Sequence, residues 1–225
     1  MLQKLETALG YEYKDQKLLK RALSHSSYAN ESHQNPLLSY ERLEFLGDSI
    51  LGFVVADYLY ATFPDKLEGE LTKIRAELVC EKNLAAIARE LSLGNYLLLG
   101  HGEGQGGGRD RSGILCDVME ALIAAAYLDS GFESAKGIVV RLILPKLTSV
   151  LSTRDYKTEL QELVQKKKNQ VITYELVGES GPDHCKEFSV CVLLNGNAVG
   201  EGSGSSKKRA EQAAAKMAIE KLFKK

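Results

Sequence analysis

Hydrophobic residues recur at three- and four-residue steps along the first two thirds of the chain, which is the spacing of one face of an α-helix. The stretch 40–63 carries Leu43, Leu46 and Ile50 at this spacing and predicts one long helix, which ends before Pro64 because proline cannot continue a helix. Three further stretches have the same spacing. The stretch 71–91 predicts one or two helices, and the stretches 113–128 and 131–151 predict one helix each. No strand-like alternation of useful length interrupts them, so this part is predicted to be all-α.

The spacing changes to that of β-strands in the last third of the chain. Apolar residues alternate with polar ones over 172–176 and again over 188–194, and the second run leads into Asn195-Gly196, a strong hairpin signal. A helical pattern precedes these strands and another follows them. We therefore predict a multidomain protein of α and α+β class, with an all-α domain over 1–151 and an α-β-β-β-α domain over 155–225.

Composition adds limits on the class of protein. The 225 residues carry 29 Lys and Arg against 30 Asp and Glu, and 44% are hydrophobic, which is ordinary for a globular protein. No apolar run approaches the roughly 18 residues of a membrane span, and acidic residues occur where a signal peptide would be apolar. We therefore expect a cytoplasmic protein with no membrane partner. The charges are not evenly spread: residues 1–154 have 17 Lys and Arg against 20 Asp and Glu, and residues 155–225 have 12 against 10.

Two other patterns point to chemistry that we consider and set aside. The chain has four cysteines: Cys80, Cys116, Cys185 and Cys191. They form no C-x-x-C pair, so we expect small buried residues of a reducing cytosol rather than metal ligands or disulfides.

The segment 102–107 satisfies G-x-G-x-x-G, but repeated strand-helix-strand units are missing around it and the chain has no P-loop. We therefore expect a mobile loop there and no nucleotide cofactor.

Paired acidic residues lie in two strongly apolar helical stretches. Glu44 and Asp48 are four residues apart, and Asp117 and Glu120 are three apart, so each pair shares one helix face. The neighbours of Asp48, including Phe45, are core-like, and we expect Asp48 to be at least half buried. Two such helices packed together would place four carboxylates around one point, which suits Mg²⁺ and phosphodiester hydrolysis. Buried salt bridges are the open alternative, with three candidate partners: Arg42, Arg75 and Arg111.

Three cations open the last predicted helix. Lys207, Lys208 and Arg209 fall in its first turn, where the helix dipole is positive and a cation costs about 0.3 kcal/mol or more. A phosphate bound at this N-terminus would reverse the sign of the interaction. The pattern predicts a phosphate contact, with a solvated run of charges as the alternative.

The acidic residues lie in segments that resemble the ribonuclease III family. Residues 41–49, Glu-Arg-Leu-Glu-Phe-Leu-Gly-Asp-Ser, look like a motif of that family at all nine positions, and 25–31 and 114–121 resemble two others. The region 155–225 resembles the double-stranded-RNA-binding domain that is usually fused to it. Three positions depart from the family pattern: Tyr40, where Asn is usual, Gly113, where Ser is usual, and Cys116, where Ala is usual.

This resemblance implies an activity and a set of active-site residues. It implies a homodimer, joined through the catalytic domain, that cleaves double-stranded RNA to 5′-phosphate and 3′-hydroxyl ends with Mg²⁺, or with Mn²⁺ as a substitute. By motif position, Glu44, Asp117 and Glu120 would hold the metal, and Asp48 and Glu120 would be most directly needed for hydrolysis. It also implies processing of ribosomal RNA precursors, tRNAs and structured mRNAs. Two rivals remain: a protein that binds duplex RNA without cutting it, and a metal phosphohydrolase of small molecules.

Three more residues of the first domain have a weaker assignment. Phe45 resembles the family residue that inserts into the partner subunit, with an ordinary core position as the alternative. Glu41 fits a substrate contact, a polar group of the dimer interface or a salt bridge on the helix surface. Glu68 follows Pro64 and fits either a contact to the RNA or the outer shell of the metal, or a solvated turn.

In the second domain, the resemblance implies contacts with two minor grooves and the major-groove phosphates between them. The residues are Gln161, Glu162, Pro182, His184, Lys207 and Lys208. The first two would meet ribose 2′-hydroxyls, the next two would enter the second minor groove, and the lysines would bridge the phosphates. Such a domain reads the shape of an A-form duplex and not its sequence.

Overall fold

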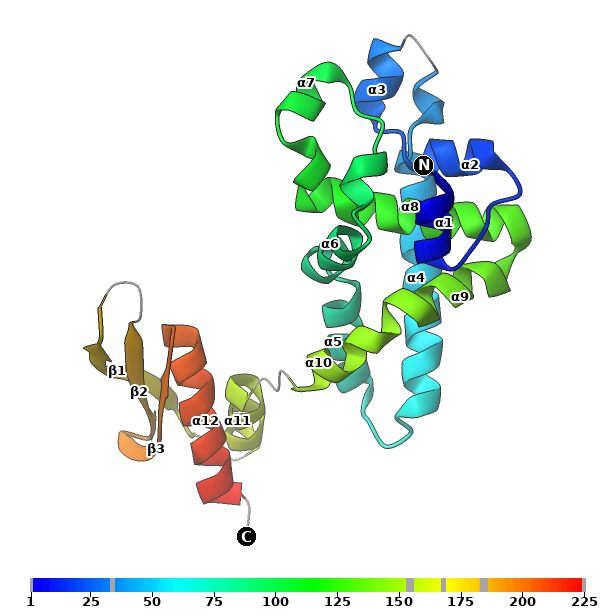
Figure 1. Ribbon diagram of the computed structural model, residues 1–225. Coiled ribbons are helices and arrows are strands. Elements are labelled where there is room, and N and C mark those ends of the chain that lie inside the picture. The colour runs from blue at the N-terminus through cyan, green and yellow to red at the C-terminus, as the bar shows by residue number, and fades with distance from the viewer. Residues whose placement is uncertain (1, 33–34, 153–155, 167–168, 183–185, 224–225) are drawn as a thin grey trace. The chain divides into compact units, whose positions relative to one another are not determined.

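The computed structural model divides the chain into two compact units, Met1–Ser152 and Thr153–Lys225 (Figure 1). Each unit has its own hydrophobic core. It describes residues 2–32, 35–152, 156–166, 169–182 and 186–223. The helical first unit and the helix-and-sheet second unit confirm the predicted fold class.

The first unit consists of α-helices joined by short 3₁₀ turns. Its helices are α1 (Leu2–Leu9), α2 (Gln16–Ala22), α3 (Ser26–Glu31), α4 (Glu41–Thr62), α5 (Glu68–Val79), α6 (Glu81–Glu90), α7 (His101–Gln105), α8 (Ser112–Ser130), α9 (Phe132–Leu142) and α10 (Leu147–Ser152). Its 3₁₀ turns are η1 (Pro36–Leu38), η2 (Leu93–Tyr96), η3 (Gly108–Asp110) and η4 (Leu144–Lys146). The long helices predicted over 40–63 and 113–128 are confirmed as α4 and α8, and the stretch 71–91 covers most of α5 and all of α6.

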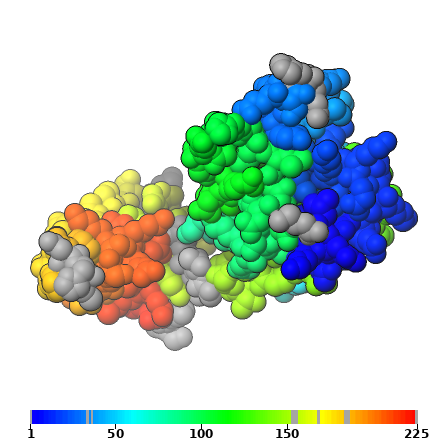
Figure 2. Space-filling view, turned by 45° about the horizontal axis from the view of Figure 1, so that its top comes forward, coloured from blue at the N-terminus to red at the C-terminus, as the bar shows by residue number. Residues whose placement is uncertain are grey.

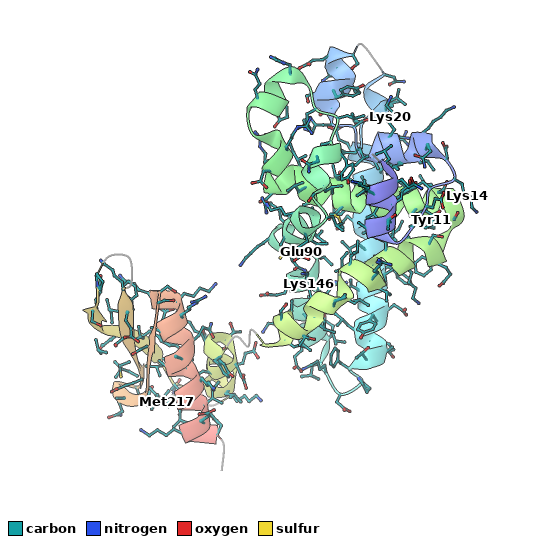
Figure 3. All side chains as sticks on the ribbon, viewed as in Figure 1. Tyr11, Lys14, Lys20, Glu90, Lys146 and Met217 are labelled. Atoms are coloured by element: carbon teal, nitrogen blue, oxygen red, sulfur yellow. The ribbon has the colours of Figure 1, made fainter. Side chains whose placement is uncertain are left out.

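The single helix expected over 131–151 is interrupted. The α-helical pattern stops at Leu142, and η4, which contains Pro145, separates α9 from α10. Proline removes a backbone donor and clashes with the preceding turn, so the helix cannot run through this position. Lys146 of η4 binds both carboxylate oxygens of Glu90 on α6, at 2.7 and 2.9 Å (Figure 3).

The helix α8 is the centre of the first unit. Each of its residues from Val118 to Ala126 is buried, and α4 packs across it. The two helices come closest at Gly47, where a Cβ atom would lie 1.9 Å from the backbone oxygen of Glu120. Any larger residue at this position would force the helices apart, so Gly47 fixes the distance between the two acidic stretches.

The helix α4 is apolar on more than the face that meets α8. Among the described residues, it is the one helix whose length and hydropathy would suffice to cross a membrane, a test that the core helix of a soluble protein also passes. Leu51, Val54 and Val55 are buried against the core, whereas Phe45 and Phe53 are 76% and 59% exposed. For Phe45, the alternative of an ordinary core position is therefore wrong, because this side chain lies on the side of α4 that faces away from α8.

The glycine-rich segment 102–107, expected as a mobile loop, lies in the short helix α7 and the turn after it. The backbone N–H of His101 donates to the carboxylate of Glu31 on α3 at 2.7 Å. Figure 2 shows the segment, drawn in green, at the surface of the first unit beside the blue N-terminal residues. Arg109 donates from Nη1 to the backbone oxygens of Gly94 and Leu97, at 2.8 and 3.0 Å. These contacts hold the segment against its neighbours.

The cysteines follow the expectation only in part. Cys116 and Cys191 are buried free thiols, as expected. Cys80 is exposed, because it lies between α5 and α6, where the chain turns at the surface. Cys185 falls outside the described residues.

The second unit has the predicted order of elements. These are α11 (Tyr156–Gln165), β1 (Ile172–Ser180), β2 (Glu187–Leu194), β3 (Asn197–Gly204) and α12 (Lys207–Phe223). The strands form an antiparallel sheet in the order β1-β2-β3. Asn195 and Gly196 make the β2–β3 turn with φ values of 51° and 80°, as the hairpin signal predicts. In β3, Gly202 lets the strand approach α12, because a Cβ there would lie 2.2 Å from the backbone nitrogen of Ala214.

Candidate active site

The packing of α4 on α8 brings the two acidic pairs together. Glu44 and Asp48 come from the first two turns of α4, and Asp117 and Glu120 come from α8. The charges of the first pair act on Glu120 directly, so the four carboxylates form one electrostatic cluster. We call these four residues the acidic cluster. Its existence was predicted from sequence, and the close contact at Gly47 is what assembles it.

Glu120 is the most deeply placed member of the acidic cluster. Glu120 is only 7% exposed. Burial, followed by repulsion from Asp48, Glu44 and Asp117, raises the pKa of Glu120 to about 8. A divalent cation would offset this repulsion, since it favours the charged form of every carboxylate around it.

Asp48 is exposed, which contradicts the expectation that it is at least half buried. The reason is its place in the helix: Gly47 faces α8, and the next residue points about 100° further round the helix axis. Asp48 therefore lies at the edge of the α4–α8 contact. Glu44 is half-buried, and burial followed by the charges of Asp117 and Asp48 raises its pKa.

The alternative of buried salt bridges does not hold among the described residues. None of their ion pairs includes a member of the acidic cluster. Arg111, one of the three candidate partners, pairs instead with Glu103 at 2.8 Å. Like charges gathered without a paired Lys or Arg fit a bound cation better than a structural network.

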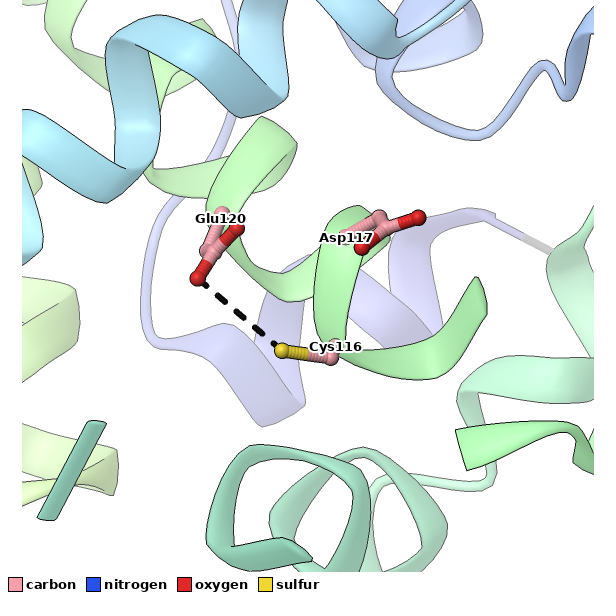
Figure 4. A group of neighbouring side chains, drawn as sticks. All are labelled: Cys116, Asp117 and Glu120. Carbon is pink, nitrogen blue, oxygen red and sulfur yellow. Dashed lines mark hydrogen bonds between the residues drawn. The ribbon is translucent and has the colours of Figure 1, made fainter. Parts of the chain in front are cut away.

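Part of the acidic cluster has the geometry of a metal site. One ligand atom each from Cys116, Asp117 and Glu120 lies within 4.8 Å of the others (Figure 4). The thiol of Cys116 donates to Oε1 of Glu120 at 3.9 Å, a weak contact. Carboxylate oxygens are the ligands that hard cations such as Mg²⁺ prefer, so Asp117 and Glu120 fit such an ion, whereas the soft thiol of Cys116 does not.

Tyr40 is a neighbour of the acidic cluster that the sequence did not reveal as such. Its hydroxyl donates to Oδ2 of Asp117 at 3.2 Å. Burial raises the pKa of Asp117, and this hydrogen bond opposes the rise. The sequence marks Tyr40 only as a departure from the family pattern, and no local signal links it to a residue 77 positions away.

The weaker candidates of the first unit lie at its surface. Glu41 is exposed and accepts a long hydrogen bond of 3.4 Å from the hydroxyl of Ser39. Glu68 is exposed at the start of α5 and accepts from the hydroxyl of Thr72 at 2.7 Å. The structure thus brings Glu41 near the acidic cluster, where its charge acts on Glu44. Among the described residues of this single chain, no such interaction is found for Glu68.

The candidate RNA-binding residues of the second unit are exposed where the structure describes them. Lys207 and Lys208 open α12, and Lys207 Nζ lies 6.0 Å from the ring centre of Phe188. Gln161 and Glu162 lie on the exposed side of α11. Pro182 is exposed, and His184 falls outside the described residues.

Comparisons with known proteins match a family to each of the two units. A family described as Ribonuclease-III-like matches residues 15–147, and the double-stranded RNA binding motif matches residues 156–222. The chain belongs to the ribonuclease III family. The Ribonuclease 3 of Pelotomaculum thermopropionicum is 51% identical over 220 residues, which cover 96% of this chain and 91% of that protein. The Ribonuclease 3 of Caldanaerobacter subterraneus is 51% identical over 225 residues, which cover 99% and 98%.

A solved structure also resembles the first part of the chain. The nuclease domain of ribonuclease III from Campylobacter jejuni matches with a TM-score of 0.59 and 45% identity, over 64% of this chain and 96% of that one. That domain is described as flexible in a region involved in dimer formation. Together with the two matched domains, these relatives identify a double-strand-specific endoribonuclease of a metal-dependent family, in which the second domain binds double-stranded RNA.

Proposed function

We propose that the acidic cluster is the hydrolytic centre, with Mg²⁺ as its metal and Mn²⁺ as a substitute. The observation that carries this proposal is the gathering of four carboxylates from α4 and α8, with none of them in an ion pair among the described residues. Glu44, Asp117 and Glu120 hold the metal. When bound, the metal supplies an activated water and stabilises the leaving oxygen of the phosphodiester.

The residues of the chain divide the remaining work. Asp48, which is exposed at the edge of the site, interacts with the phosphodiester and its attacking water. Glu120 is enclosed by the surrounding core, which limits the orientations that its carboxylate can take. Cleavage leaves a 5′-phosphate and a 3′-hydroxyl end.

The second unit binds the duplex through the exposed start of α12. Lys207 and Lys208 contact the phosphates of the major groove, where a bound anion removes their conflict with the helix dipole. Gln161 and Glu162 contact one minor groove, and the loop with Pro182 and His184 contacts the next. These contacts recognise double-stranded RNA by its shape.

The working enzyme is a homodimer formed through the first unit. Phe45 supports this proposal, because a phenylalanine with 76% exposure loses apolar contact with water when a second copy covers it. The relative from Campylobacter jejuni, described with a region involved in dimer formation, agrees with it. Glu41 and Glu68, both exposed in the single chain, then act as substrate or interface groups. The substrates are ribosomal RNA precursors, tRNAs and structured mRNAs of the cytoplasm.

Cleavage of a long duplex and a single strand of the same sequence tests the catalytic assignment. We expect Mg²⁺-dependent cleavage of the duplex only, and none in the presence of a chelator. Glu120→Gln keeps the volume of the side chain and removes its charge, so it should reduce cleavage by more than about 100-fold, beyond the 10–100-fold typical of outer partners of a metal. Duplex binding should be unchanged. Full cleavage by Glu120→Gln would refute the assignment.

A further inference from the structure

Tyr40 stands directly before the acidic stretch of α4 and is only 3% exposed. Its hydroxyl crosses from the start of α4 to α8, where it donates to Oδ2 of Asp117 at 3.2 Å. An apolar ring of the same size would fill the same space without this hydrogen bond. The hydroxyl of Tyr40 therefore adds a polar contact to Asp117 beyond the packing of its ring.

The position of the Tyr40 hydroxyl is set by the fold. Its backbone N–H donates to the backbone oxygen of Ser24 at 2.8 Å, and its ring centre lies 5.7 Å from that of His25. His25 is itself held, since its Nδ1 accepts from the backbone N–H of Ser27 at 3.1 Å and caps α3. Backbone, ring and hydroxyl of Tyr40 are therefore each fixed by a separate contact.

The hydrogen bond constrains how Asp117 offers its oxygens. A carboxylate that is held at one oxygen cannot rotate freely about its last bond, so the group is presented in one orientation. Asp117 belongs to the group of three side chains whose ligand atoms lie within 4.8 Å of one another. In other metal sites, removing a partner that holds a metal ligand from behind commonly lowers the metal affinity by about 10–100-fold.

We propose that Tyr40 is a positioning residue that orients Asp117 for the divalent cation and thereby raises the affinity of the site for it. The inference rests on the ligand role proposed for Asp117.

Binding of Mn²⁺ to the full chain without RNA tests this role, with free Mn²⁺ measured by electron paramagnetic resonance. Tyr40→Phe keeps the ring and removes the donor, so we expect Mn²⁺ affinity to fall about 10-fold. Tyr13→Phe is a matched control. Tyr13 is 2% exposed and donates to the backbone oxygen of Leu122, also on α8, at 2.9 Å. Its loss should lower the melting temperature of the protein without changing Mn²⁺ affinity.

A second measurement separates positioning from general damage. The Mg²⁺ concentration that gives half-maximal cleavage should rise about 10-fold in Tyr40→Phe, with the rate at saturating Mg²⁺ close to that of the wild type. Mn²⁺ affinity within twofold of the wild type would overturn the proposal, and so would an equal loss in Tyr13→Phe.

Asp117→Asn distinguishes this inference from the proposed function beneath it. If Asp117→Asn leaves Mn²⁺ affinity unchanged, Asp117 is not a ligand and the proposed centre is wrong. If Asp117→Asn weakens binding but Tyr40→Phe does not, the centre stands and only the role of Tyr40 is refuted.

Discussion

The acidic cluster of the first unit and the cations that open α12 are both groups of like charges that destabilise the free protein. In the cluster, repulsion and burial raise the pKa of Glu120 to about 8. At α12, Lys207 and Lys208 sit at the positive end of a helix whose first turn has no acidic residue. Each conflict would be relieved by the ligand proposed for it: a cation in the first case and a phosphate in the second.

The two regions differ in how firmly the charges are held. Glu120 lies inside the packed contact of α4 and α8, so its position is as fixed as that of the core. The lysines are exposed on long side chains, outside any packed core. Hydrolysis of one phosphodiester bond requires carboxylates in fixed positions. Binding to the repeating phosphates of a duplex tolerates exposed side chains whose positions are less fixed. Substitutions should therefore act steeply on the cluster and gradually on α12.

The largest effect should come from changing the contact that assembles the cluster. Gly47→Ala places a Cβ 1.9 Å from the backbone oxygen of Glu120, so α4 and α8 must separate. We expect the free energy of unfolding to fall by about 1–3 kcal/mol and cleavage to be nearly lost. Thermal unfolding and a cleavage assay measure the two effects.

Gly137→Ala is the control for this change. Gly137 is an exposed glycine inside α9 with nothing within 4 Å of its Cβ position. Alanine there should stabilise the helix by about 0.5–1 kcal/mol and leave cleavage unchanged. Equal behaviour of the two variants would show that close approach at Gly47 does not build the site.

The next effect concerns the exposed cations. Replacing Lys207 and Lys208 together by Ala should weaken duplex binding and make the dependence of log affinity on log salt shallower by about 2, one unit for each lost phosphate contact. Without RNA, the same change should slightly raise the melting temperature, because the cations oppose the helix dipole. Titrations of a duplex at several salt concentrations measure the slope.

Lys221→Ala is the matched change at the other end of α12. Lys221 is exposed in the last turn, where a cation is favourable. Its loss should leave the salt dependence unchanged and slightly lower the melting temperature. An identical slope change in both variants would argue for diffuse attraction instead of a defined phosphate contact.

A smaller effect should appear in the pH dependence of stability without metal. The pKa of Glu120 is raised from 4.5 to about 8 on folding, so between these values the folded protein holds a proton that the unfolded chain has released. Its contribution to stability therefore decreases as the pH rises through this window. Melting temperatures at pH 5.5 and pH 8 in a chelator should show a larger decrease for the wild type than for Glu120→Gln. Mg²⁺ should reduce the difference, and parallel curves would contradict the coupling.

The smallest effect should follow Cys116→Ala, which introduces the residue usual in the family. The thiol contact to Glu120 is weak at 3.9 Å, and the lost sulfur leaves a small cavity. We expect about 1 kcal/mol less stability and cleavage within about twofold of the wild type. A loss above tenfold would place Cys116 among the groups that the reaction needs.

Local pattern was sufficient for most of the fold. Helical spacing predicted α4 and α8, and the alternation ending in Asn195-Gly196 predicted the β2–β3 hairpin, because periodicity and turn chemistry are properties of neighbouring residues. The break at Pro145 was missed although its signal is local, since the apolar pattern continues on both sides of it.

Exposure was harder to predict than helix position. Asp48 lies among apolar residues and was expected to be at least half buried, and a core position was one of two alternatives for Phe45, yet both are exposed. An apolar stretch shows that a helix packs against something, but not which of its sides faces the core and which is left open. That choice depends on where α8 crosses α4.

The sequence by itself determined the two domains, the four carboxylates and the lysines that open α12, because each is a matter of residue type and local spacing. Only the tertiary structure decided that Gly47 sets the distance between the acidic pairs, that Glu120 is buried while Asp48 is exposed, and that Tyr40 reaches Asp117. These are contacts between residues far apart in the chain. They exist because packing α4 against α8 fixes positions that no local pattern encodes.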